Sequence, residues 1–380
     1  MLILSIETSC DDTGVAITEK RENGEIKVRG SALSSQDGIH KKWGGVYPFE
    51  AKRAHQRNLV PTLIKALEKA DLLEEGGVSE PEGLEEIFTR EKTLLEQTRA
   101  FFKKYQIKKE IDKIAVTKGP GLEPCLFAGI NFAKALSLYL EVPIIPVNHI
   151  KAHVLFFLKD KKEMKFPAIT LIVSGGHTEL ILMHSPGSFE LLGGTRDDAA
   201  GECFDKTARI LGLGYPGGPA IATKAAEFEI QNSKFEINLP RPMINSNDYD
   251  FSFSGLKTAV LYDVLSQDEK TKKSEEYVGE MAKEIEEAIT DVLISKSKKA
   301  MKDHGTKTLI MGGGVTANQT LQEKAKNLEK EFPGTEVILP SPELSTDNAE
   351  IIGIAATAEK EEVAPENLGP DANLKMYDRM

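Results

Sequence analysis

Two segments far apart in the chain share one pattern, in which an apolar run, a polar turn and a second apolar run follow each other. Leu2–Ile6 and Gly14–Thr18 enclose the first turn, and Ala168–Val173 and Glu179–Met183 enclose the second, Ser174–Thr178. Short apolar runs bounded by turn residues are typical of buried strands. Each segment therefore predicts a strand–turn–strand unit, and their recurrence predicts an internal duplication.

A third unit joins a strand to a helix through glycine. Thr308–Met311 is apolar, three glycines follow at residues 312–314, and Asn318–Glu331 has the apolar spacing of a helix. Glycine lets backbone N–H groups approach a ligand closely, and a helix N-terminus favours a phosphate or a polar edge. Two hairpins and one glycine-rich turn in this order are typical of the actin-like ATPase superfold. We therefore expect an α/β protein with two lobes, each built on a mixed sheet.

The length of 380 residues supports two lobes, because a chain of this length is longer than those that usually fold around a single hydrophobic core. We expect an N-terminal lobe at residues 1–147, joined by the tail 353–380, and a C-terminal lobe at 148–352 that carries most of the nucleotide and metal site. Residues 70–112 combine an acidic loop with helical apolar spacing. They predict an inserted helical segment that is either a solvent-facing decoration or a docking element for a partner.

The composition is that of an ordinary globular protein, with 40% hydrophobic and 28% charged residues. The most apolar region, Leu126–Val147, is interrupted by polar and charged residues, so we expect no membrane span. The first residues reach Glu7 without a basic segment, which indicates a buried strand and not a signal peptide. Three isolated cysteines, Cys10, Cys125 and Cys203, favour the reducing cytoplasm over a disulfide framework.

The formal net charge of −11 at pH 7 argues against a broad nucleic-acid-binding surface. Proteins that bind RNA through its phosphates normally present a basic surface. If this protein handles RNA, it must use a restricted basic patch or borrow one from a partner.

His149 and His153 form an HxxxH pair. In a helix, residues four apart lie about 40° apart around the axis and about 6 Å apart along it, so both imidazoles could hold one metal ion. The zinc peptidases with this spacing have a glutamate after the first histidine as general base. Ile150 occupies that position here, so peptidase chemistry lacks its base. The third ligand must come from elsewhere, and a distant carboxylate in a loop is the best candidate.

Long motifs make the chain resemble one family, the TsaD-type tRNA threonylcarbamoyladenosine transferases. The matching stretches are IETSCDDTGVAI (6–17), KGPGL (118–122), NHIKAH (148–153), LIVSGGHTEL (171–180), DDAAGECFDKTARILGLGYPGGP (197–219), FSFSGLKTAV (251–260), GGGVTAN (312–318) and STDNAEIIG (345–353). Apart from the insert, they cover most of residues 1–356 in the order of the family.

The resemblance implies an acyltransferase with the two-lobed actin-like (ASKHA) fold and a nucleotide of the ATP or AMP type in its cleft. The implied reaction moves a threonylcarbamoyl group from threonylcarbamoyl-AMP to N6 of adenosine 37 in tRNAs that read ANN codons. The implied metal ligands are His149, His153 and Asp347. Two histidines and one carboxylate leave open coordination positions, which suits Fe²⁺ first and Zn²⁺ as the alternative.

Further residues acquire roles from the same resemblance. The substrate- and nucleotide-binding residues would be Ile172, Val173, Ser174, Gly175, Gly176, Asp205, Gly218 and Asn318. The turn within this set can present backbone N–H groups to a developing negative charge. Asp205 would accept hydrogen bonds from a ribose. The backbone of Gly218 would lie against the nucleotide, and Asn318 would present its amide to the nucleoside.

Asp11 and Asp12 lie on the first hairpin and are the candidate catalytic residues. One of them could accept the proton of the attacking amine as general base, although aspartate is also common in turns for conformational reasons. The family usually has Asp-Glu at these positions, and the shorter side chain of Asp12 reaches about one methylene less far. His55 follows in a charged run and is expected to be an exposed helix residue, although the family often places a histidine nearby that helps near the tRNA or the adenylate.

The resemblance also implies partners: tRNA, a paralogous non-catalytic subunit of the TsaB type, a small ATPase of the TsaE type, and a TsaC-type synthase that supplies the adenylate. Three alternatives remain open from the sequence. They are an ATP-dependent kinase or ATPase of the same superfold, a non-catalytic scaffold paralogue, and the metallopeptidase activity once assigned to this family as an O-sialoglycoprotein endopeptidase.

Overall fold

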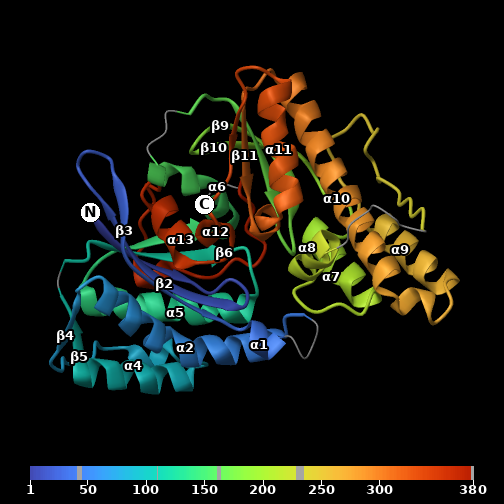
Figure 1. Cartoon of the computed structure of the whole chain (residues 1–380). Coiled ribbons are helices and arrows are strands. Elements are labelled where there is room, and N and C mark those ends of the chain that lie inside the picture. The colour runs from blue at the N-terminus through green and yellow to red at the C-terminus, as the bar shows by residue number, and fades with distance from the viewer. Residues whose placement is uncertain (41–44, 109, 161–163, 228–234, 378–380) are drawn as a thin grey trace. The chain divides into compact units, whose positions relative to one another are not determined.

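The computed structural model describes residues 1–40, 45–108, 110–160, 164–227 and 235–377 (Figure 1). The chain divides into two compact units. Unit 1 comprises Met1–Glu163 and Thr346–Met380, and unit 2 comprises Met164–Ser345. These boundaries differ from the expected division into 1–147 and 148–352, because the segments that carry His149, His153 and Asp347 belong to unit 1.

Unit 1 is built on a five-stranded sheet of order β3-β2-β1-β6-β7. The strands are β1 (Leu2–Glu7), β2 (Asp12–Lys20), β3 (Ile26–Ser35), β6 (Lys113–Gly119) and β7 (Ile144–Asn148). The first three form an antiparallel meander, and β6 lies parallel to both β1 and β7. Helices α2 (Pro48–Lys69) and α5 (Glu123–Leu140) cover one face, and α13 (Ala349–Ala356) covers the other (Figure 1).

Unit 2 repeats this topology with the order β10-β9-β8-β11-β12. Its strands are β8 (Ala168–Val173), β9 (Thr178–Ser185), β10 (Ser188–Gly194), β11 (Thr308–Gly312) and β12 (Glu336–Ile338). The first three are again antiparallel and β11 is parallel to both β8 and β12. The matching strand order confirms the predicted duplication and the mixed α/β fold.

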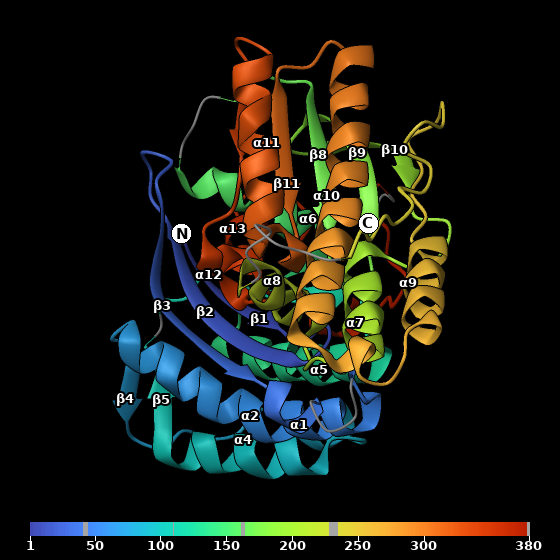
Figure 2. The ribbon, with the colours of Figure 1, turned by 45° about the vertical axis from the view of Figure 1, so that its right-hand side comes forward.

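The helices of unit 2 pack against its sheet and against one another. They are α7 (Ala200–Ile210), α8 (Gly217–Glu227), α9 (Ser254–Ser266), α10 (Glu275–Asp303), α11 (Gln319–Glu331) and the short α12 (Pro342–Ser345). Figure 2 shows α10 and α11 along the sheet, where α10 contacts β8 and β11 while α11 contacts β12. Among the described helices, none combines the length and the apolar character needed to cross a membrane.

The segment at residues 70–112 contributes to the core of unit 1. Its ends pair as the antiparallel strands β4 (Leu73–Glu75) and β5 (Tyr105–Ile107), which enclose α3 (Leu84–Ile87) and α4 (Lys92–Lys104). Leu94, Phe101 and Phe102 of α4 are buried among the core residues. The predicted inserted helix is therefore present, but its apolar side is packed against the protein and is not a solvent-facing decoration.

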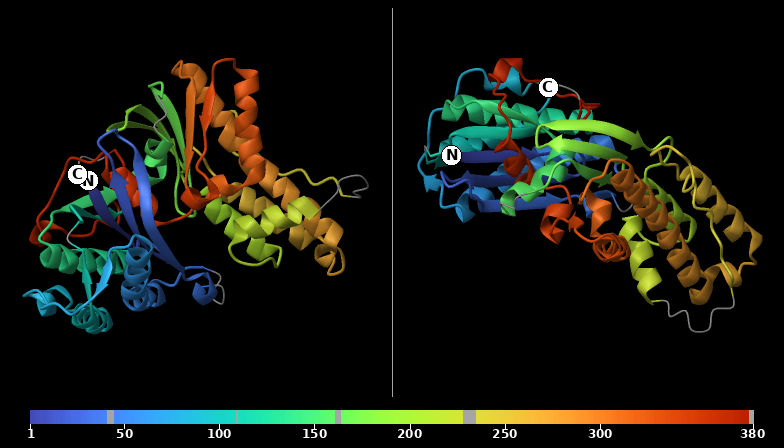
Figure 3. Two further views of the ribbon diagram at one scale, coloured as in Figure 1. Left: turned by 60° about the vertical axis from the view of Figure 1, so that its left-hand side comes forward. Right: turned by 90° about the horizontal axis from the view of Figure 1, so that it is seen from above.

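Helix α13 explains why the end of the chain belongs to unit 1. The hydroxyl of Ser5 in β1 donates a hydrogen bond to the carbonyl of Ala349 at 2.7 Å. Gly353 lies so close to β2 that a Cβ atom there would stand 2.3 Å from Oγ1 of Thr18. Figure 3 shows this C-terminal segment, in red, against the blue strands of unit 1. The close contact fixes the residues just before α13 above the N-terminal strands.

Candidate active site

The two histidines of the HxxxH motif lie on a short helix that begins where β7 ends. Asn148 caps this helix, α6 (His149–Leu155), because its side chain accepts a hydrogen bond from the backbone N–H of Lys151 at 3.0 Å. The ring centroids of His149 and His153 are 4.7 Å apart and the rings are perpendicular. The helical spacing therefore brings both imidazoles to one place.

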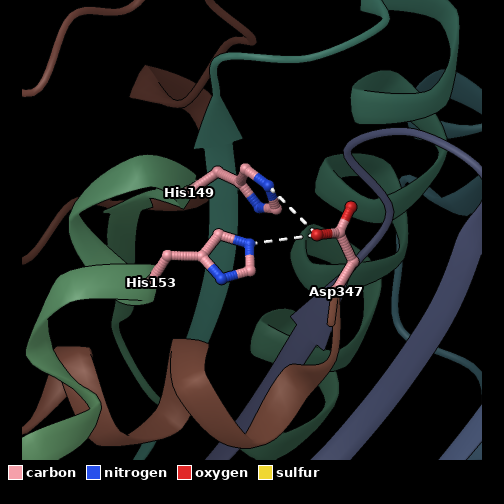
Figure 4. A group of neighbouring side chains, drawn as sticks. All are labelled: His149, His153 and Asp347. Carbon is pink, nitrogen blue, oxygen red and sulfur yellow. Dashed lines mark hydrogen bonds and ion pairs between the residues drawn. The ribbon is translucent and has the colours of Figure 1, made fainter. Parts of the chain in front are cut away.

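Asp347 completes the cluster from a distant part of the chain. Its Oδ1 lies 3.0 Å from Nε2 of His153 and 3.5 Å from Nε2 of His149 (Figure 4). The prospective ligand atoms all lie within 4.8 Å of one another. Two imidazole nitrogens and one carboxylate oxygen suit a divalent transition metal. The three residues that the resemblance implied as ligands are thus brought together within unit 1, and their donor set fits the expected metal.

Glu7, at the end of β1, is a fourth charged residue at this cluster. Its side chain is fully buried, and its Oε2 accepts hydrogen bonds from Nδ1 of His149 at 3.0 Å and from the hydroxyl of Thr117 at 2.6 Å. Burial opposes ionisation, but the attraction to His149 and the hydrogen bonds outweigh it and lower the pKa of the carboxyl. From the sequence, Glu7 marked only the start of a turn. An acidic residue that closes an apolar strand was the available signal.

The candidate catalytic aspartates lie on the turn between β1 and β2. Asp11 is in the turn and Asp12 is the first residue of β2, where it pairs with Ser35; both side chains are half-buried. Burial and the negative charges of Asp11 and Asp347 raise the pKa of Cys10 well above its usual range. The thiol is therefore protonated, which disfavours a role as nucleophile.

His55 was expected to be exposed on its helix, and this prediction was wrong. Its side chain is fully buried, because α2 packs against the sheet and turns this residue toward the β1–β2 turn. Its Nε2–H donates to the carbonyl of Cys10 at 3.0 Å, and its Nδ1 accepts from the hydroxyl of Thr13 at 2.8 Å. Burial lowers the pKa of His55 to about 4, so the ring is neutral. Its two hydrogen bonds hold the turn that carries the aspartates.

The expected substrate-binding stretch forms the hairpin turn of unit 2. Ile172 and Val173 are buried in β8, while Gly175 and Gly176 are exposed at the turn. Ser174 closes the turn, since its hydroxyl accepts the backbone N–H of residue 177 at 3.1 Å. The turn packs against the glycines of two other motifs: the carbonyl of Ser174 accepts the N–H of residue 201, and the carbonyl of Val173 lies against residue 313.

The remaining expected residues lie on helices of unit 2: Asp205 within α7, Gly218 in the first turn of α8 and Asn318 at the start of α11. Oδ1 of Asp205 accepts the N–H of Gly217 at 2.6 Å, which places Asp205 beside Gly218, where a side chain would meet open space. Asn318 caps α11 by accepting the N–H of Leu321 at 2.8 Å. Its amide donates to the carboxylate of Glu286 at 2.5 Å. Sequence reasoning missed Glu286, because helical spacing gave no reason to pair it with a residue on another helix.

Comparison with known proteins places this arrangement in a family. The model of the TsaD family, described as tRNA N6-adenosine threonylcarbamoyltransferase, matches residues 27–76 and 89–354. The chain belongs to this family. The match omits residues 77–88, so only this part of the expected insert at 70–112 lies outside the family pattern.

Whole-length relatives carry the same name. The tRNA N6-adenosine threonylcarbamoyltransferase of Thermosipho africanus is 42% identical over 355 residues, which is 93% of each chain. That of Ralstonia pickettii is 40% identical over 93% of this chain and 90% of the relative. That of Bacillus cereus is 38% identical over 98% and 95%, respectively. The chain is thus a member of a transferase family that modifies tRNA.

A solved structure agrees with the fold at much lower sequence similarity. HypF of T. kodakarensis superimposes with a TM-score of 0.54 and 10% identity, covering 94% of this chain and 47% of that protein. This likeness, with the duplicated mixed sheets, confirms the actin-like fold.

Proposed function

We propose that this protein transfers the threonylcarbamoyl group from threonylcarbamoyl-AMP to N6 of adenosine 37 in tRNAs that read ANN codons, with AMP as the other product. The observation that carries the proposal is the close approach of His149, His153 and Asp347 in a chain that matches the transferase family over most of its length. A kinase or a scaffold of the same fold has no evident use for this cluster.

The three clustered side chains would hold one divalent metal, Fe²⁺ in preference and Zn²⁺ as the alternative. When bound, such an ion supplies Lewis-acid polarisation and charge stabilisation to an oxygen of the substrate. His149 and His153 are buried while Asp347 is 27% exposed, so the ligand set is anchored on one side and open at the carboxylate. This openness is what a substrate-binding site requires.

The hairpin turn of unit 2 and residues on helices α7, α8 and α11 would hold the adenylate. The exposed glycines at 175 and 176, which follow Ile172, Val173 and Ser174, can offer backbone N–H groups to the phosphate or to the developing oxyanion. Asp205, whose Oδ1 accepts the N–H of residue 217, would accept a hydrogen bond from a ribose hydroxyl. Gly218 adds no side chain beside it, and Asn318 keeps one amide hydrogen beyond the one donated to Glu286.

The bond changes in this proposal are those of an acyl transfer. N6 of adenosine forms a bond to the carbamoyl carbon, and the bond from that carbon to the phosphate oxygen of AMP breaks. The amine loses a proton, and Asp11 or Asp12 is the proposed acceptor, because both lie on the β1–β2 turn that follows Glu7, and Glu7 contacts His149. His55 would keep the turn in place through its two hydrogen bonds.

Partners complete the proposal. The protein would act with a paralogous TsaB-type subunit and a small TsaE-type ATPase, and a TsaC-type synthase would supply the adenylate. The net charge of −11 supports this dependence, because a chain with this charge gains from a partner that contributes basic surface for tRNA. A tRNA substrate places the proposed reaction in the cytoplasm.

The decisive experiment measures incorporation of labelled threonine into an ANN-decoding tRNA by the chain with its companion proteins. We expect label with the native chain and a loss of at least about a hundredfold with Asp347→Ala, together with loss of bound metal. Asp11→Asn should lose rate but keep its metal, and Glu82→Ala, an exposed carboxylate outside the family match, should behave like the native chain.

The result against the proposal is equally definite. If an assembled complex that holds metal gives no label with the native chain, the transferase function is wrong. Hydrolysis of ATP alone would then favour the kinase or ATPase alternative, and the absence of any turnover would favour a scaffold.

A further inference from the structure

A buried carboxylate stands behind the metal cluster and has no role in the reaction proposed above. Glu7 ends β1 with its side chain fully buried, and both of its oxygens accept hydrogen bonds. Oε1 accepts the backbone N–H of Ser9, and Oε2 accepts the hydroxyl of Thr117 at 2.6 Å. These donors hold the carboxylate on the opposite side of His149 from Asp347.

The geometry of the imidazole ring links Glu7 to the choice of coordinating atom. Nδ1 of His149 lies 3.0 Å from Oε2 of Glu7, while Nε2 of the same ring lies 3.5 Å from Oδ1 of Asp347. An ionised carboxylate can accept hydrogen bonds but cannot donate them. The hydrogen between Glu7 and His149 must therefore be on Nδ1 of the histidine. In the neutral ring that a metal ligand must have, the lone pair is then on Nε2, which faces the other ligands.

The second histidine lacks this support. Nε2 of His153 faces Asp347 at 3.0 Å, but Nδ1 is buried and has no hydrogen-bond partner among the described residues. Of the two imidazoles, His149 is therefore the one whose orientation is set from behind by a charged group.

We propose that Glu7 is a positioning residue for the metal ligand His149. Its carboxylate orders the ring, makes Nε2 the coordinating atom and adds a second negative charge to that of Asp347 near the cation. The inference rests on the metal site of the proposed function. Histidine ligands commonly donate their second N–H to a carboxylate, and loss of such a partner typically weakens metal binding about 10–100-fold.

A purely structural role is the competing explanation, because Glu7 also joins β1 to β6 through Thr117. The test therefore measures Zn²⁺ affinity by competition with a chelator, and separately the thermal unfolding of the metal-free protein, for the whole chain and its Glu7→Gln variant. Glutamine has the same shape, but its amide group must oppose one of the donors around it. We expect the Zn²⁺ dissociation constant to rise about 10–100-fold.

Glu91→Gln is the matched control. Glu91 is also a buried carboxylate of unit 1, but it contacts Lys52 and Asn131, each at 3.0 Å, and no histidine. It should change thermal unfolding and leave Zn²⁺ affinity within about twofold of the native value. An unchanged affinity in Glu7→Gln would overturn the proposal, and so would an equal loss in both variants.

A measurement on the native chain keeps the proposal testable if Glu7→Gln does not fold. With ¹⁵N-labelled histidine and Zn²⁺ bound, the resonances that disappear in His149→Gln identify the ring of His149. We expect a protonated Nδ1 and a metal-bound Nε2, and the reverse assignment would refute the role of Glu7. Neither readout involves tRNA, so a failure of the transferase proposal remains distinguishable: native metal binding without threonine transfer would count against that function alone.

Discussion

His55 connects helix α2 to the β1–β2 turn, which carries Asp11 and Asp12. It does so through two hydrogen bonds, one donated and one accepted. It donates to the carbonyl of Cys10 and accepts from the hydroxyl of Thr13. Acceptance at Nδ1 requires the neutral ring and donation from Nε2 requires the hydrogen there, and burial favours the neutral state by lowering the pKa to about 4. Protonation would leave the hydroxyl of Thr13 without its acceptor and put a charge in a buried place.

This arrangement predicts a pH dependence of stability. The pKa of His55 is about 4 in the folded chain against 6.5 for an ordinary histidine, so between these values the unfolded chain binds a proton that the folded chain does not. The free energy of unfolding should therefore decrease as the pH falls from 6.5 toward 4, by up to about 3 kcal/mol from this residue. Chemical denaturation across this range, compared with His55→Gln, measures the contribution.

The variant should show the shallower profile over that window. His184→Gln is the control, because His184 is about half exposed and its replacement should leave the profile unchanged. Parallel profiles for the native chain and His55→Gln would show that His55 does not carry this pH dependence.

At the residue scale, sequence motifs located the aspartates and the candidate metal ligands but not their supporting groups. His149 and His153 could be paired from their spacing alone, whereas Asp347 was named through resemblance. Glu7 and Glu286 were missed, since a lone carboxylate has no periodicity that reveals its contacts. The exposure predicted for His55 was wrong because its charged neighbours in the sequence suggest an exposed side of the helix.

At the scale of elements, the packing of α13 against the sheet of unit 1 positions Asp347, which lies just before this helix, beside the two histidines. Asp347 immediately precedes Asn348, whose side chain caps the helix by accepting the N–H groups of residues 350 and 351. The helix itself lies against β1 and β2, with Gly353 at the closest point. The position of Asp347 thus depends on how tightly a single helix packs.

Replacing this glycine should be costly. In Gly353→Ala, the new Cβ would stand 2.3 Å from Oγ1 of Thr18 and 3.0 Å from Oγ of Ser5. Overpacking of this kind typically costs about 1–3 kcal/mol, despite the better helix propensity of alanine. Urea denaturation measures the loss. In the matched variant Gly255→Ala, on an exposed helix position with open space, stability should be unchanged or slightly higher, and an equal effect at both positions would contradict the packing argument.

Several strands and helix α11 were predicted, because their apolar periodicity is local. The runs at Leu2–Ile6, Ala168–Val173 and Thr308–Met311 correspond to β1, β8 and β11 with small differences at the ends. The segment at 70–112 was predicted only in part. Its helix was predicted, but its contribution to the core was not, because that depends on the contact between α4 and α2.

At the scale of the whole molecule, the charge balance conflicts with the chemistry of the substrate. The chain has 59 acidic and 48 basic residues besides seven histidines, and tRNA is a polyanion. Binding through phosphates gains its free energy from counterion release at basic groups, so an acidic protein gains little unless the basic groups are concentrated or supplied by another chain.

We therefore expect the isolated chain to bind an ANN-decoding tRNA weakly, with a dissociation constant no tighter than about 10⁻⁶ M at physiological salt. Addition of the companion subunits should tighten binding at least about tenfold. Filter binding over a salt series tests this expectation. Tight, steeply salt-dependent binding by the chain alone would show instead that it has its own concentrated basic surface.

The sequence by itself determined the strand runs, their duplication, the HxxxH pair and, through long motifs, the family. Each of these is a property of contiguous residues, because periodicity and spacing act over a few positions. The tertiary structure alone decided which distant groups meet: Asp347 reaches His153 across 194 positions and Glu7 reaches His149 across 142. It also assigned α6 and α13 to unit 1. Such contacts follow from the packing of strands and helices into a shared core, which no local pattern encodes.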